Sequence, residues 1–149
     1  MNNNRFFELR EYNNLTQKEL ATIFNVKQQT YSDWESSKKI IPLKHLVTLA
    51  NYYHLSINYI LGLSNIKKEL STQIKIDKTK ISQNLITIRK ENNLLQKDLA
   101  KALNTTPSTI CAYEKGKTTI LTAFAYQICK KYQISFDYLI GASSTKTLK

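Results

Sequence analysis

The sequence repeats itself, and this internal duplication constrains the fold more than any other feature of the chain. When the 149-residue sequence is shifted by 79 positions, residues 5–64 align with residues 84–143 without a gap, and about 18 of the 60 pairs are identical. The identities include polar pairs, such as Asn13 with Asn92, as well as apolar ones. Two copies of so long a unit are too few for a solenoid of short repeats, so the sequence predicts two small domains in tandem.

Each copy is expected to be a run of five short helices, because its apolar residues follow helical spacing and strand patterns are absent. Thr16 and Glu19 form a capping box at the start of a second helix, although Leu95 replaces the threonine in the second copy. Pro107 suits the first position of a third helix, and Gly116 suits a left-handed residue just after its end. The fold class is therefore predicted to be all-α, with two tandem five-helix bundles.

The boundaries of the two domains follow from the extent of the duplication. The sequence predicts one domain over residues 1–64 and a second over residues 80–143. Residues 65–79 are polar and are expected to form a linker, and residues 144–149 are expected to form a flexible tail.

Charge and composition narrow the functional classes. The net charge of +11 favours a polyanionic partner such as nucleic acid or an anionic membrane surface, and residues 80–149 hold most of the excess. Three glycines cannot build a phosphate-binding loop, and neither a catalytic motif nor a Cys/His cluster with metal-ligand spacing occurs. We therefore expect no enzymatic activity, no cofactor and no metal. No transmembrane or signal segment is evident, which predicts a soluble cytoplasmic protein without a membrane partner.

One motif stands in each copy: LTQKELATIFNVKQQTYSDWESSK at residues 15–38 and LLQKDLAKALNTTPSTICAYEKGK at residues 94–117. Both resemble the helix-turn-helix family of the phage lambda, 434 and Cro repressors, also called the xenobiotic-response-element family. The resemblance covers about 120 of the 149 residues and implies that the second and third helices of each bundle form a DNA-binding unit. Trp34 and Tyr113 look like the aromatic residue that packs the third helix onto its bundle.

The resemblance also assigns structural and DNA-contacting residues. Two pairs with the same 25-residue separation match a partly buried structural salt bridge: Arg10 with Glu35, and Arg89 with Glu114. The candidates for base readout are Lys27, Gln28, Gln29, Thr30, Ser32 and Asp33 in the first copy, and Thr106, Ser108 and Thr109 in the second. The candidates for phosphate contact are Gln17, Lys38 and Lys39, and in the second copy Gln96, Lys97 and Lys117.

The two third helices differ in reading capacity. The pair Gln28 and Gln29 resembles the reading pair of the 434-type repressors, since glutamine can make two hydrogen bonds to adenine. Pro107 and Ser108 replace this pair in the second copy, which nevertheless carries more positive charge. The second copy is thus either an electrostatic anchor on DNA or an interaction module. Cys111 on the same helix is either an inert small side chain or a redox-sensitive position.

The leading hypothesis is a sequence-specific, double-stranded-DNA-binding transcriptional regulator, a repressor that occupies an operator. One alternative is a protein-interaction module, such as an antitoxin or antirepressor with a protein partner, and another is a low-specificity architectural nucleic-acid binder. A homodimer is favoured, because the second copy is poorly equipped for base readout and because fifth-helix side chains offer a surface for association, although a core helix would carry the same residues. These side chains are Ile57, Tyr59, Ile60, Phe136, Tyr138 and Leu139.

Overall fold

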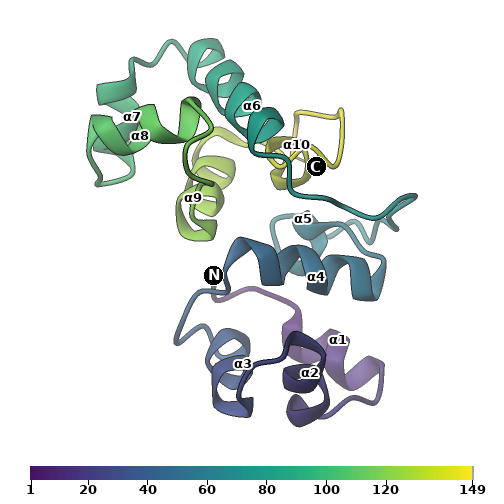
Figure 1. The fold of residues 1–149 in the computed structure, drawn as a ribbon. Coiled ribbons are helices and arrows are strands. Elements are labelled where there is room, and N and C mark those ends of the chain that lie inside the picture. Colours follow the sequence, from purple (N-terminus) through teal and green to yellow (C-terminus); the bar gives the residue numbers. More distant parts are fainter. Residues whose placement is uncertain (149) are drawn as a thin grey trace. The chain divides into compact units, whose positions relative to one another are not determined.

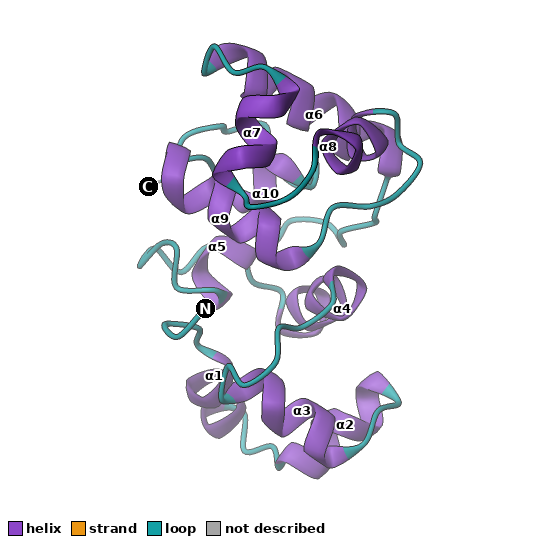
Figure 2. Cartoon of the chain, turned by 90° about the vertical axis from the view of Figure 1, so that its left-hand side faces the viewer, coloured by secondary structure: helices purple, strands orange, loops and turns teal. Residues whose placement is uncertain are grey.

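The computed structural model describes residues 1–148, and every regular element within them is an α-helix (Figures 1 and 2). The chain divides into two compact units between Gln73 and Ile74, which we call unit 1 and unit 2. Unit 1 contains α1 (Phe6–Tyr12), α2 (Gln17–Phe24), α3 (Gln28–Glu35), α4 (Leu43–Tyr53) and α5 (Ile57–Ile60). Unit 2 contains α6 (Lys78–Glu91), α7 (Gln96–Ala102), α8 (Pro107–Glu114), α9 (Thr122–Tyr132) and α10 (Phe136–Leu139). The predicted all-α fold with five helices in each copy is confirmed.

Each unit has a core to which all five of its helices contribute. In unit 1, each helix contributes at least one fully buried side chain; in helix order, examples are Phe6, Leu20, Tyr31, Leu46 and Ile57. The matching buried side chains of unit 2 are Leu85, Leu99, Ile110, Ile128 and Phe136. Every helix is too short to be stable alone, so burial of these apolar faces is what holds the helices in place.

Trp34 joins the third helix of unit 1 to the rest of its core. Its side chain is 5% exposed, and its ring centroid lies 5.7 Å from that of Phe24 on α2 and 5.1 Å from that of His45 on α4. Tyr113 is buried at the matching place on α8. Both aromatic side chains therefore pack within their units, as expected, and are not placed to stack on a base.

Left-handed backbone explains why asparagines recur in both copies. Asn14 and Asn93 follow the first helix of each unit with φ angles of 56° and 57°. Asn25 and Asn104 follow the second helix with φ angles of 55° and 56°. Asparagine adopts this conformation more readily than other residues with a Cβ, so these identities record backbone geometry.

The segment expected to be a linker, residues 65–79, divides between the two units. The backbone N–H of Ser56 donates to Lys68 O at 2.9 Å, and that of Leu70 donates to His54 O at 2.9 Å. The chain thus folds back onto unit 1 as far as Leu70, while α6 includes the last two residues of the expected linker. Residues 71–77 are the part that lies between these two points.

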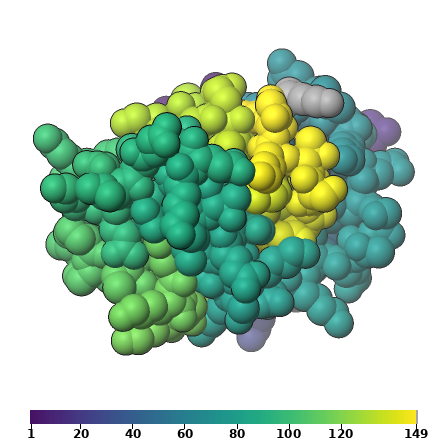
Figure 3. Space-filling model, turned by 90° about the horizontal axis from the view of Figure 1, so that it is seen from above, coloured from purple at the N-terminus to yellow at the C-terminus, as the bar shows by residue number. Residues whose placement is uncertain are grey.

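The last described residues of unit 2 return in the same way. Ser135 N–H donates to Lys146 O at 2.7 Å, Leu148 N–H donates to Gln133 O at 3.1 Å, and Lys146 Nζ lies 2.6 Å from Glu91 Oε1. Figure 3 shows this C-terminal segment in yellow beside the teal of α6. Within residues 144–149, which were expected to form a flexible tail, Lys146 and Leu148 therefore have partners in unit 2, and Lys149 lies outside the described residues. The returning segment is one residue shorter than in unit 1, so an alignment without gaps stops before it.

Candidate nucleic-acid interface

In unit 1 the helix-turn-helix consists of α2 and α3. Thr16 Oγ1 accepts a hydrogen bond from the backbone N–H of Glu19 at 3.0 Å, and the Glu19 carboxylate accepts from the backbone N–H of Thr16 at 3.4 Å. This capping box fixes the first residue of α2, and the left-handed Asn25 ends the helix. Ala21 is buried, so a larger side chain there would displace the helix-turn-helix packing.

The corresponding start of α7 in unit 2 is only half capped. Leu95 has no acceptor atom in its side chain, but its backbone N–H donates to Asp98 Oδ2 at 2.8 Å. The sequence indicated that this cap is lost; the structure retains the reciprocal half of the box through Asp98. Leu95 itself is left exposed.

A buried ion pair ties α1 to the end of α3. Arg10 Nε lies 2.9 Å from Glu35 Oε2, a second guanidinium N–H donates to Glu35 Oε1 at 3.0 Å, and a third donates to Leu15 O at 3.0 Å. Burial raises the pKa of Glu35, but hydrogen bonds from Arg10 and Gln17 outweigh it and hold this pKa below its ordinary value. The hydrogen bonds to Glu35 raise the pKa of Arg10, so both groups stay charged.

Unit 2 repeats this arrangement. Arg89 Nε lies 2.7 Å from Glu114 Oε2, another guanidinium N–H donates to Glu114 Oε1 at 2.9 Å, and a third donates to Leu94 O at 2.8 Å. The hydrogen bond to Glu114 raises the pKa of Arg89. Removing one partner of such a pair would strand a buried charge.

The glutamines expected at phosphates are attached to these ion pairs. Gln17 Nε2 donates to Glu35 Oε1 at 3.3 Å, and Gln96 Nε2 donates to Glu114 Oε1 at 3.2 Å. Both side chains are half-buried at the first position of α2 and α7. An amide nitrogen carries two hydrogens, so one N–H of each glutamine remains for another acceptor.

The start of α3 presents a polar, solvent-exposed face. Lys27, Gln28 and Gln29 are exposed, and Gln28 makes no side-chain hydrogen bond to any residue from 1 to 148. Thr30 and Ser32 are half-buried. These side chains supply both donors and acceptors on one short helix.

Asp33 differs from the other readout candidates because it is buried. Its side chain is 7% exposed, and its carboxylate accepts a hydrogen bond from Gln29 Nε2 at 2.9 Å. Lys39, an expected phosphate contact, has its Nζ 3.7 Å from Asp33 Oδ2 and is 70% exposed. The burial of Asp33 does not favour a direct contact between its carboxylate and a base.

The matching face of α8 carries small side chains whose hydroxyl groups lie within hydrogen-bonding distance of one another. Thr106 Oγ1 accepts from the backbone N–H of Thr109 at 3.3 Å and lies 3.0 Å from Ser108 Oγ and 2.9 Å from Thr109 Oγ1. The three hydroxyl groups thus bond mainly to one another. Cys111 is half-buried on the same helix.

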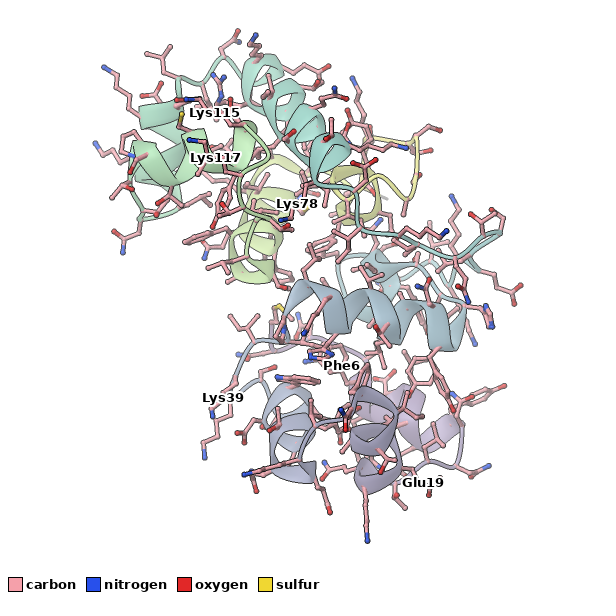
Figure 4. The ribbon with its side chains drawn as sticks, in the orientation of Figure 1. Phe6, Glu19, Lys39, Lys78, Lys115 and Lys117 are labelled. Carbon is pink, nitrogen blue, oxygen red and sulfur yellow. The ribbon has the colours of Figure 1, made fainter. Side chains whose placement is uncertain are left out.

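Three lysines lie close to α8, and the sequence predicted a DNA contact for only one of them, Lys117. Lys115 and Lys117 flank Gly116, whose Cα lies against the start of α6: a Cβ there would lie 3.9 Å from the Lys78 backbone O (Figure 4). We call Lys78, Lys115 and Lys117 the basic edge of unit 2. All three are exposed, and none has an ion-pair partner among residues 1–148. Lys115 lies within the quoted motif, whereas Lys78 was hidden in the expected linker.

The remaining two lysines that were expected to contact phosphates lie on the surface. Lys38 after α3 and Lys97 on α7 are exposed, with no ion pair among the described residues. Within residues 1–148 no helix is long and apolar enough to cross a membrane.

The fifth helices do not offer the association surface that their composition suggested. Of the six apolar and aromatic side chains considered there, all but Tyr59 are buried. The core interpretation of these residues therefore holds, because helices of four residues must bury most of their side chains to stay folded.

Comparison with known proteins agrees with the local geometry in both units. The family model described as helix-turn-helix matches residues 7–60 and again residues 85–139. YobD of Bacillus subtilis, named as an uncharacterized HTH-type transcriptional regulator, is 38% identical over 61 residues. That match covers 41% of this chain and 54% of the relative, so it spans about half of the relative's length.

Proposed function

Because this chain belongs to the helix-turn-helix family, with a match in each of its units, we propose that it is a sequence-specific, double-stranded-DNA-binding transcriptional regulator. The observation that carries the proposal is the polar start of α3, where Lys27, Gln28 and Gln29 are exposed. We propose that these side chains enter the major groove of DNA. Glutamine amides hydrogen-bond to base edges, and the first turn of a recognition helix is the part that reaches them.

The ion pair behind α3 supports this role. Arg10 and Glu35 hold the end of α3 against α1, and Glu35 also holds the Gln17 amide. The remaining N–H of Gln17 is our candidate for a phosphate contact that sets the docking position of unit 1. Gln96 in unit 2 has the same arrangement through Glu114.

Unit 2 is proposed to bind phosphates without reading sequence. Residues 74–149 contain 13 basic and 5 acidic residues, whereas residues 1–73 contain 9 and 6. The basic edge is exposed and unpaired among the described residues, while the hydroxyl groups at the start of α8 bond to one another. Contacts to phosphates supply affinity in a sequence-independent manner, so unit 2 would anchor the chain beside the site that unit 1 reads.

A repressor role and a homodimer complete the proposal. Each of the two units contains a helix-turn-helix. A protein of this kind that is bound at a promoter blocks access by other proteins, and this is the repressor role that we propose. The two recognition helices differ, so a palindromic site would need α3 from two copies of the chain. Light scattering together with the symmetry of a selected site tests this part, and a monomer bound to a non-palindromic site would contradict it.

The decisive experiment selects bound sequences from a random double-stranded DNA pool with the full chain, then measures affinity by fluorescence anisotropy. Gln29→Ala is expected to cost about 1–3 kcal/mol on the selected site and to relax preference at one or two base pairs. Gln127→Ala, an exposed glutamine on α9 outside both helix-turn-helix elements, is the control and is expected to change neither the motif nor the affinity by more than about 0.5 kcal/mol.

The alternative functions correspond to distinct outcomes of this experiment. Salt-sensitive binding without a preferred sequence would indicate an architectural binder. Absence of DNA binding at low salt, with tight binding to a protein partner, would indicate an interaction module. An unchanged motif and affinity for Gln29→Ala would refute the role of unit 1 as the reader.

A further inference from the structure

A buried carboxylate on the recognition helix of unit 1 has no evident purpose in the fold. Asp33 lies on α3 with its side chain 7% exposed, and its closest side-chain partner is Gln29, one helical turn earlier. Lys39 is the second partner, at 3.7 Å. Burial of a charged carboxylate is unfavourable unless hydrogen bonds compensate for the lost water, so Asp33 is a residue whose presence requires a reason.

Unit 2 shows that the helix-turn-helix forms without this carboxylate. In the duplicated sequence Asp33 matches Ala112, Gln29 matches Ser108, and Lys39 matches Thr118. The third helix nevertheless has eight residues in both units. All three members of the group are absent together from the unit that lacks a glutamine to orient.

The hydrogen bond to Asp33 decides which end of the Gln29 amide faces outward. An ionised carboxylate accepts hydrogen bonds and cannot donate them, so the Gln29 NH2 group must be the end that faces Asp33. The Gln29 carbonyl oxygen is thereby turned away from the carboxylate. Because Gln29 is exposed, α3 presents this oxygen to a partner as an acceptor of fixed direction.

The base edges of the major groove distinguish such an acceptor. Adenine offers an N6 amino group and cytosine an N4 amino group, whereas guanine and thymine offer acceptors at the corresponding place. Adenine also presents N7, which can accept the second hydrogen of the Gln29 NH2 group. An oriented Gln29 therefore matches adenine best, cytosine next, and guanine or thymine worst.

We propose that Asp33 is a positioning residue that fixes the Gln29 amide, so that unit 1 selects adenine, and secondarily cytosine, at the base that Gln29 faces. The proposal rests on the function proposed above, in which α3 reads the major groove. Asp33 touches no base; it acts through the hydrogen bond to Gln29.

The test compares Asp33→Asn with the wild-type chain in the same selection from a random DNA pool. An asparagine amide can accept or donate, so it no longer dictates which end of Gln29 faces outward. The position that Gln29 reads is found first from Gln29→Ala. At that position the wild type is expected to prefer adenine over guanine by about 5- to 150-fold, and Asp33→Asn by less than about threefold.

Glu8→Gln is the matched control, because it removes one negative charge from an exposed position on α1 of the same unit. Both variants remove a negative charge and are expected to raise the overall affinity for DNA, but Glu8→Gln is expected to raise it for all sequences alike, whereas Asp33→Asn is also expected to change the base preference. Asp33→Ala, which copies the residue of unit 2, provides a second variant should Asp33→Asn not fold, as judged by circular dichroism.

The outcomes separate this inference from the function on which it rests. If Gln29→Ala changes no base preference, the reading role of α3 fails. If Gln29→Ala changes the preference but Asp33→Asn keeps that of the wild type, the positioning role fails alone. In the wild-type chain, NMR is expected to show slower hydrogen exchange for the Gln29 side-chain NH2 than for that of Gln28; equal rates would also overturn the positioning role.

Discussion

Replacement of Arg10 by methionine tests the buried ion pair that anchors α3. The variant keeps an unbranched apolar stem but removes two hydrogen bonds to Glu35 and one to Leu15 O. The Glu35 carboxylate, only 8% exposed, then retains Gln17 at 3.3 Å as its side-chain hydrogen-bond donor. Breaking a buried pair in this manner costs about 3–5 kcal/mol, which is a large part of the stability of a unit of this size.

The double variant Arg10→Met/Glu35→Leu serves as the matched control. It removes both charges, so no carboxylate is left stranded, and its free energy of unfolding is expected within about 1 kcal/mol of the wild type. Trp34 provides the assay, since it is the only tryptophan in the chain and lies in the core of unit 1. Its fluorescence during urea unfolding therefore reports on unit 1.

The pH dependence of the free energy of unfolding provides an independent test of the ion pair. In the wild type the pKa of Glu35 lies below its unfolded value, so its stabilising contribution is present above about pH 4.3 and is lost as pH falls through the lower folded pKa. Without Arg10, burial raises this pKa, and the contribution of Glu35 becomes unfavourable as pH rises. The difference between wild type and Arg10→Met is thus expected to be larger at pH 7 than at pH 3. A difference below about 1 kcal/mol at pH 7, or one that does not vary with pH, would refute the reasoning.

Three further predictions follow from local geometry. Gly62→Ala is expected to destabilise unit 1 by more than Gly116→Ala destabilises unit 2. The reason is that a Cβ on Gly62 would lie 2.1 Å from Asn3 O, whereas one on Gly116 meets nothing closer than 3.8 Å. Thermal unfolding measures both losses, and losses of similar size would contradict the prediction. Leu95→Thr should raise the stability of unit 2 by about 1 kcal/mol by completing the capping box, and no gain would show that the cap is not limiting. Lys117→Ala should lower the slope of log affinity against log salt by about 0.9 without altering the selected motif; a changed motif would assign base contacts to unit 2.

Local patterns in the sequence were sufficient for the fold class and for much of the helix-turn-helix. The capping box, the proline at the start of α8 and the repeated asparagines act over a few residues, so their effect can be read from spacing alone. The ion pairs were expected from the resemblance to the repressor family, and the duplication repeats their 25-residue separation in both copies. The roles of the site residues on DNA stay predictions.

The tertiary structure decided the features that depend on distant parts of the chain. Whether Asp33 faces the groove or the core depends on the rotation of α3 against its unit, and an aspartate on a polar helix is compatible with either. The basic edge brings Lys78 to residues nearly 40 positions later, and the returning segments differ in length by one residue, which conceals their likeness from a gapless alignment. Sequence periodicity determined which faces are apolar, but only packing determined which polar side chains those faces enclose, because burial is a property of the assembled unit.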